Sequence, residues 1–162
     1  PQLTRVLRAG SEGHTTIINP FGAVVVQNKC MMAFMHDYKH HFSTETQDVI
    51  NEYIPETCRM VDVDAKQLIR EEWVLKSVYG CEGDEVLIGR TMSDEQWNLA
   101  LDLAIDRHWI LQRYFEPRRR DGRIANYGVY LLAGNAAGIF TRLSPEATDL
   151  HSLSTATLVE MQ

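Results

Sequence analysis

The sequence has few cysteines, no long apolar run and no excess of basic residues. Its three cysteines, Cys30, Cys58 and Cys81, are odd in number and share no metal-ligand spacing, so a disulfide framework is not expected. No apolar stretch approaches the ~18 residues of a membrane-spanning helix, and no signal peptide pattern opens the chain. The net charge of -6 argues against a nucleic-acid surface, which needs basic residues to neutralise phosphates. We therefore expect a cytoplasmic protein whose partners include neither nucleic acid nor membrane.

What is present has the composition of an ordinary globular domain. Of the 162 residues, 44% are hydrophobic and 23% are charged, which suits one domain or two small lobes that share a core. The local patterns predict one unit with three parts: a helix-rich lobe over residues 1–70, a β-loop-β-α-β lobe over 71–145 and a C-terminal tail over 146–162. The start at Pro1, without Met, suggests a piece of a longer chain.

In the first part the patterns favour helices. The β-branched run Thr15–Ile18 predicts a strand that ends at Asn19 and Pro20, and residues 21–27 predict an irregular turn. Three helices are then expected: one capped by Asn28 and ending between His36 and His41, one over Ser43–Tyr53 with Thr44 and Gln47 at capping-box spacing, and a short one over Asp64–Arg70.

From residue 73 onward, strands dominate. Strands are predicted at residues 73–76, 85–88, 109–115, 124–132 and 138–142, with a turn at Gly134 and Asn135. Ser93 and Gln96 form a capping box for an amphipathic helix that would pack on the sheet. The fold class is therefore α+β, with mixed or antiparallel sheets flanked by helices.

A strand that ends in Lys76 precedes a loop with Gly80 and Gly83. A lysine there could reach a phosphate, and the glycines could let backbone N–H groups close over it. An ordinary hairpin explains the same spacing. The GxxxxGK[ST] pattern of a P-loop is absent.

Lys29, at the start of a predicted helix, is unfavourable for the helix dipole, and an anionic ligand would relieve that conflict. A solvated lysine is the alternative. Gln112, Arg113, Tyr114 and Phe115 form an expected edge or linking strand that could hold a purine, unless it is an ordinary core strand. Arg142 could bind a carboxylate or acyl-phosphate in two-pronged fashion, or form a surface ion pair.

The order of these segments resembles that of circularly permuted ATP-grasp proteins of the glutathionylspermidine synthetase-like group, in their C-terminal portion. Residues 18–29 (INPFGAVVVQNK) resemble the family's N-x-x-G and N-K-A segment, and residues 74–83 (VLKSVYGCEG) resemble its V-x-K-P-x-x-G-x-G-G strand and loop. Residues 110–115 (ILQRYF) are similar to the hinge strand beside adenine, and residues 138–142 (GIFTR) to the G-G-x-x-R strand. The resemblance covers residues 15–145 and implies a partial ATP-grasp unit.

The resemblance implies an ATP-dependent carboxylate–amine ligase that acts through an acyl-phosphate. ATP phosphates would contact Lys29 and Lys76 under a loop with Gly80 and Gly83, adenine would lie beside residues 112–115, and Arg142 would act in catalysis. Mg²⁺ would accompany ATP, with metal ligands outside this sequence. The substrates would be a small carboxylate and an amine. Because Glu82 and Asp84 would repel phosphates, a non-catalytic binding or scaffold domain is the alternative.

Overall fold

The computed structural model describes residues 2–18, 22–80, 83, 85–105, 108–146 and 151–158. The α-helices are α1 (Gln2–Ser11), α2 (Ala23–Gln27), α3 (Cys30–Asp37), α4 (Thr44–Tyr53) and α5 (Asp94–Ala104). The strands are β1 (Thr57–Arg59), β2 (Trp73–Ser77), β3 (Val86–Ile88), β4 (Trp109–Arg113), β5 (Arg119–Arg120), β6 (Arg123–Leu132), β7 (Asn135–Ser144) and β8 (Leu153–Thr155). Short 3-10 helices are η1 (Lys39–His41), η2 (Met60–Asp62), η3 (Ala65–Gln67), η4 (Arg70–Glu72) and η5 (Gly89–Thr91).

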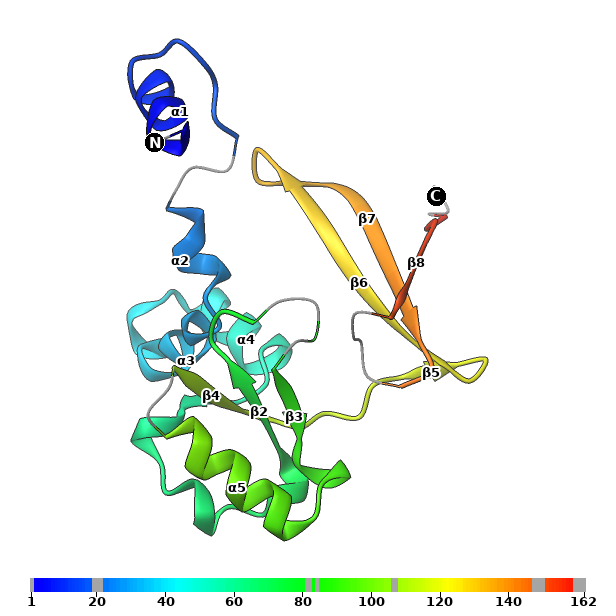
Figure 1. Cartoon of the computed structure of the whole chain (residues 1–162). Coiled ribbons are helices and arrows are strands. Elements are labelled where there is room, and N and C mark those ends of the chain that lie inside the picture. The colour runs from blue at the N-terminus through cyan, green and yellow to red at the C-terminus, as the bar shows by residue number, and fades with distance from the viewer. Residues whose placement is uncertain are drawn as a thin grey trace.

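The first sheet has the strand order β1-β4-β2-β3, and every neighbouring pair in it is antiparallel. Helix α5 lies on one side of this sheet, and α3 and α4 lie on the other (Figure 1). This arrangement of helices on antiparallel sheets confirms the expected α+β class and agrees with a partial ATP-grasp-like unit.

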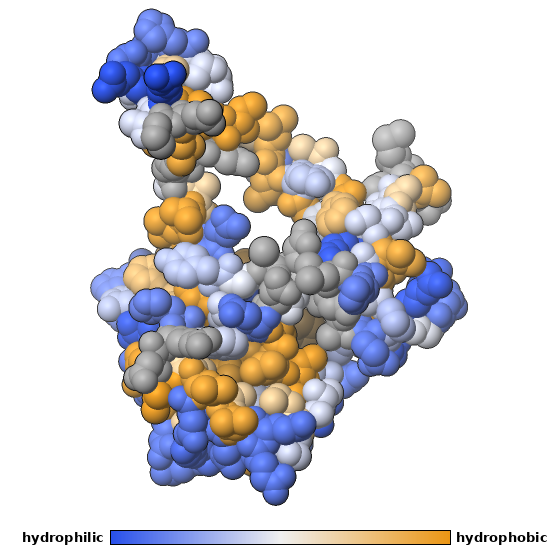
Figure 2. Space-filling model, in the orientation of Figure 1, coloured by the Kyte–Doolittle hydropathy of each residue, from blue (hydrophilic) through white to orange (hydrophobic). Residues whose placement is uncertain are grey.

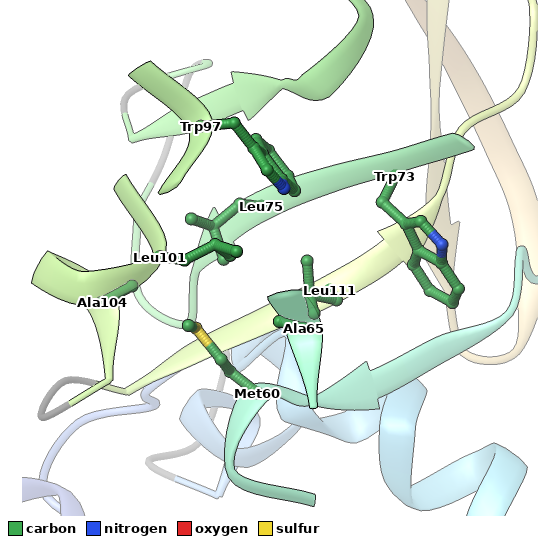
Figure 3. Packing of buried hydrophobic residues seen from close by; sticks show 8 residues of the cluster. All are labelled: Met60, Ala65, Trp73, Leu75, Trp97, Leu101, Ala104 and Leu111. Atoms are coloured by element: carbon green, nitrogen blue, oxygen red, sulfur yellow. The ribbon is translucent and has the colours of Figure 1, made fainter. Parts of the chain in front are cut away.

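The core fills the space between this sheet and α5. Because side chains of a strand alternate between faces, Trp73 and Leu75 of β2 point to the same side, where Leu111 of β4 joins them. Figure 3 shows Leu75 close to Trp97 and Leu101 of α5, with Trp73 at the other end of the cluster. The cluster comprises Met60, Ala65, Trp73, Leu75, Trp97, Leu101, Ala104 and Leu111.

The start of α5 confirms the predicted capping box. The Ser93 hydroxyl accepts from the backbone N–H of Gln96 at 3.2 Å, and the Gln96 side chain accepts from the Ser93 N–H at 2.9 Å. Two backbone donors that the first helical turn cannot pair are satisfied in this way. The capping pattern therefore fixes where α5 begins, and the spacing of Trp97, Leu101 and Ala104 sets which of its faces meets the sheet.

The second sheet has the order β5-β6-β7-β8 and is built around the long β6–β7 hairpin (Figure 1). Residues 114–118 lead to it from β4. Its two-residue turn holds Ala133 at φ 48° and Gly134 at φ 80°, the positive values that a type I′ turn needs. Apolar side chains stay exposed along much of this hairpin, which forms part of the apolar surface in Figure 2.

Several local predictions were wrong. Residues 15–18 form no strand, since β-branched residues need a neighbouring strand to complete the ladder. Residues 23–27 of the expected irregular turn form α2, while Asn19, Pro20 and Phe21 lie outside the described residues. The predicted helix over residues 64–70 is replaced by η3 and η4, because Leu68 between them is extended (ψ 145°) and packs against the core.

Other predictions hold with shifted ends. The helix over residues 43–53 forms, but Ser43 caps it, and its hydroxyl accepts from the N–H of Thr46. The strand expected over 109–115 ends at Arg113. Strand β1 comes from the part expected to be helix-rich, and β8 comes from the expected tail. In the part of the chain that is described, no helix has the length and apolar character needed to cross a bilayer.

Candidate functional site

Lys76 lies on the face of the first sheet that is turned away from the Leu75–Leu111 core. In the register of β2 and β4, Lys76 pairs with Ile110 and Val74 pairs with Gln112. Lys76 and Gln112 are therefore diagonal neighbours on one face, where long side chains can touch. The Lys76 Nζ donates to the Gln112 Oε1 at 2.6 Å. This contact gives the ammonium of the half-buried lysine an acceptor within the sheet.

Gln112 is buried, with 3% of its surface exposed, and both ends of its amide are paired. The Nε2 donates to the Thr57 hydroxyl of β1 at 2.9 Å and approaches the Met32 Sδ of α3 at 3.3 Å. The Thr57 hydroxyl in turn donates to the Pro55 carbonyl at 2.7 Å. A buried amide of this kind is costly unless it is satisfied, and here it is.

Lys29 immediately precedes α3 and is joined to the end of β2 twice. Its backbone N–H donates to the Val78 carbonyl at 3.1 Å, and its Nζ donates to the Gly80 carbonyl. The side chain of Asn28 accepts from the Cys30 N–H at 2.8 Å, but the N-cap of α3 is Lys29, one residue after the predicted cap. The start of α3 and the loop after β2 therefore meet at Lys29.

The electrostatics of the site follow from two cations that share one region. Burial lowers the pKa of the Lys76 ammonium below its usual 10.5, and the positive charge of Lys29 lowers the pKa of Lys76 further. Both causes act against a protonated Lys76. An anion bound between the two ammonium groups would offset their repulsion and favour the protonated form of Lys76, so this region is suited to a phosphate or carboxylate.

The loop after β2 carries the two predicted glycines. Gly83 has φ 90°, a value that L side chains rarely adopt, so a glycine is required there. The backbone N–H of Gly80 donates to the Ser77 hydroxyl at 3.2 Å. Cys81, Glu82 and Asp84 lie outside the described residues, and the proposed closure of the loop over phosphate remains a prediction.

The strand predicted to hold adenine is an inner strand. Strand β4 lies between β1 and β2, so the backbone of Gln112 takes part in both ladders, and the expectation of an edge strand there was wrong. The Arg113 side chain pairs with Glu72 at 2.8 Å. Only after the strand ends does the chain reach the second sheet, through a segment that begins with Tyr114 and Phe115.

These two aromatic residues lie differently. The Tyr114 backbone N–H donates to the Glu72 carbonyl at 2.7 Å, and Arg90 stacks over its ring at 3.7 Å from the ring centre. The Phe115 side chain is 61% exposed. Of the predicted adenine-side residues, Phe115 is the one whose side chain faces solvent to this extent.

Arg142 lies on β7 of the second sheet, opposite Asn126 of β6 and Ser154 of β8. It belongs to a different sheet from Lys76, and Lys29 lies at the start of α3. The structure thus brings together the two lysines, Gln112 and the start of the glycine loop, while Arg142 comes from the other sheet. Its role at an acyl-phosphate remains a prediction.

A mainly apolar hollow of about 460 Å³ lies beside Lys29, lined by residues of α2, α3 and the loop after β2. The lining residues are Val24, Val25, Asn28, Cys30, Met31, Phe34 and Tyr79. A larger hollow of about 620 Å³ lies between β3 and α5, and neither lysine lines it. Neither lysine lines the smaller hollow, but Asn28 and Cys30, the two chain neighbours of Lys29, do.

No group of three or more His, Cys, Asp or Glu residues that could hold a metal ion occurs in the described ranges. Sequence reasoning also missed Thr57 and Met32, which fix the Gln112 amide. Thr57 sits in a three-residue strand without a clear alternating pattern, so no signal in the sequence marks it. Met32 was expected on a helix but not as a sulfur contact.

The fold is consistent with a partial ATP-grasp-like unit. Residues 2–155 match the protein family described as Glutathionylspermidine synthase preATP-grasp, and the chain belongs to this family. The family relates it to a ligase. No curated protein and no solved structure matches the chain.

Proposed function

We propose that this chain is the nucleotide-gripping part of an ATP-dependent carboxylate–amine ligase of the circularly permuted kind, which acts through an acyl-phosphate. Its substrates are a small carboxylate and an amine. The observation that carries the proposal is the meeting of Lys29 and Lys76, two cations from distant segments, beside one glycine loop. Two nearby cations repel each other, and a bound anion offsets that repulsion.

ATP supplies the phosphoryl group in such a reaction. Lys29 and Lys76 bind its phosphates and offset their charge, and the loop with Gly80 and Gly83 covers them with backbone N–H groups. This role needs positioning and charge stabilisation rather than a covalent bond to the protein. The residues fit a triphosphate because two cations and a loop with a required glycine lie together.

The remaining roles are assigned by position in the chain. The segment after β4, with Tyr114 and Phe115, lies between the two sheets in sequence and holds the adenine side. Arg142, from the second sheet, steadies the carboxylate that is activated. Mg²⁺ accompanies ATP, and its ligands come from outside this sequence.

A second function, a non-catalytic binding or scaffold domain, is favoured by one observation. Both ammonium groups already have acceptors within the protein, the Gly80 carbonyl for Lys29 and the Gln112 amide for Lys76. A lysine that only ties segments together makes the same contacts. The family description, which speaks of a preATP-grasp portion, also suits this alternative.

Equilibrium binding of ATP, with and without Mg²⁺, separates the two functions. For a ligase, Lys29→Met and Lys76→Met each weaken binding by roughly 10- to 100-fold, since a charge-assisted hydrogen bond contributes about 1.5–3 kcal/mol. The matched control is Lys66→Met, because Lys66 is exposed and pairs with Asp102 of α5. If the parent chain binds no ATP at millimolar concentrations, the scaffold function is the correct one.

A further inference from the structure

We propose that Gln112 and Thr57 are positioning residues that hold the Lys76 ammonium in place for a bound phosphate. This inference rests on the proposed function, and it assigns Gln112 a role different from contact with adenine. The geometry for it comes from three adjacent strands, β1, β4 and β2, each of which contributes one side chain to a single hydrogen-bonded row.

The row has a fixed direction. The Pro55 carbonyl can only accept a hydrogen bond. The Thr57 hydroxyl therefore donates its single proton to that carbonyl, at 2.7 Å. Thr57 Oγ1 must then accept from Gln112, which turns the Nε2 of the amide toward β1. The opposite end of the amide, the carbonyl Oε1, is thereby aimed at Lys76. A backbone carbonyl thus sets the orientation of an amide two steps away.

Burial makes this orientation firm. Thr57 is 2% exposed and Gln112 is 3% exposed, so water cannot easily replace a lost partner on either side chain. The approach of Nε2 to the Met32 Sδ is compatible only with the amide end that carries hydrogens. An amide turned the other way would face Lys76 with N–H groups and would lose both the acceptor for Lys76 and the donor for Thr57.

The choice of a neutral acceptor matters for the ligand. A carboxylate at position 112 would hold the ammonium as well, but it would cancel the charge that a phosphate needs. The amide carbonyl holds Lys76 and leaves the net positive charge in place. Together with the nearby charge of Lys29, this keeps the region attractive to an anion.

Two readouts test the proposal on the 162-residue chain. The first is the pH at which Lys76 becomes reactive, measured without nucleotide by competitive labelling with acetic anhydride and mass spectrometry of the Lys76 peptide. The second is the affinity for ATP with Mg²⁺. Thermal unfolding followed by circular dichroism identifies which variants are folded.

The Gln112→Glu variant should raise the midpoint pH of Lys76 labelling by about one unit or more, because an opposite charge favours the ammonium form. It should also weaken ATP binding by roughly 10-fold, since the charge is neutralised. Thr57→Val should lower the midpoint, because an unfixed amide no longer offers its carbonyl. Thr57→Ser keeps the hydroxyl and should match the parent. If Gln112→Glu does not fold, the comparison of Thr57→Val with Thr57→Ser tests the proposal instead.

The two proposals fail in different ways. If the midpoint of Lys76 is the same in the parent, Gln112→Glu and Thr57→Val, Gln112 does not hold Lys76, whatever happens to nucleotide. If the midpoint moves as expected but no variant, including Lys76→Met, changes ATP affinity, the positioning stands as a property of the fold and the nucleotide function is wrong.

Discussion

The two faces of the first sheet are built from the same strands and carry opposite chemistry. On β2 and β4, Leu75 and Leu111 enter the apolar core against α5, while Lys76 and Gln112, one position further along each strand, enter a polar row against α3. A shift of one residue in register would exchange the two faces. The apolar face therefore specifies the register, and the register places the lysine.

The largest expected effect comes from breaking the apolar face. Leu101→Ala should lower the free energy of unfolding by about 2–5 kcal/mol, because it removes a side chain that is 1% exposed and leaves a cavity. Urea unfolding measures the change. The matched control on the same helix is Leu99→Ala, whose side chain is 60% exposed and whose loss should matter little. Equal losses in the two variants would show that α5 does not pack as described.

The reactivity of Cys58 gives a second test of the apolar face of the first sheet. Burial, together with the negative charges of Glu56, Asp62 and Asp37, raises the pKa of the Cys58 thiol from 9.0 to about 11. At pH 8 its thiolate fraction should be roughly 100-fold lower than for an ordinary thiol, so alkylation by iodoacetamide should be slowed at least as much. Peptide mapping by mass spectrometry follows the rate, with the urea-unfolded chain as the control. Similar rates in the folded and unfolded chain would contradict this environment.

The polar face predicts a smaller, pH-dependent effect. Because the pKa of Lys76 lies below 10.5, Lys76 loses its proton at a lower pH than an ordinary lysine. As the pH rises, ATP affinity should therefore begin to fall below pH 10.5. The total loss should be up to roughly 10-fold. Isothermal titration calorimetry at several pH values measures this loss. In Lys76→Arg the side chain stays charged at every pH tested, so its affinity should fall less. An identical fall in both would assign the effect to another group.

Sequence reasoning succeeded where a local pattern determines the structure. Ser93 and Gln96 define the start of α5, and the apolar run over residues 73–75 followed by Lys76 marks a strand. It failed where the outcome depends on distant partners. Residues 15–18 have strand-forming side chains and no ladder to join, and the inner position of β4 depends on β1, which has only three residues.

The candidate site shows the same division. The motifs around Lys29, Lys76 and the two glycines could be found from their order in the chain. The orientation of Gln112 could not, because it depends on the Thr57 hydroxyl and the Pro55 carbonyl, which are brought to it only by strand pairing. A pattern within one segment cannot predict a row of hydrogen bonds that crosses three strands.

The most direct measurement of the central claim is a double-mutant cycle for ATP binding with Lys29→Met, Lys76→Met and the double variant, by isothermal titration calorimetry with Mg²⁺. If both ammonium groups contact one polyphosphate, each single change weakens binding and the two effects fail to add by about 0.5 kcal/mol or more, as is typical of groups that share a partner. If either single variant binds ATP like the parent, or if the two losses add without any coupling, the two lysines do not grip one ligand.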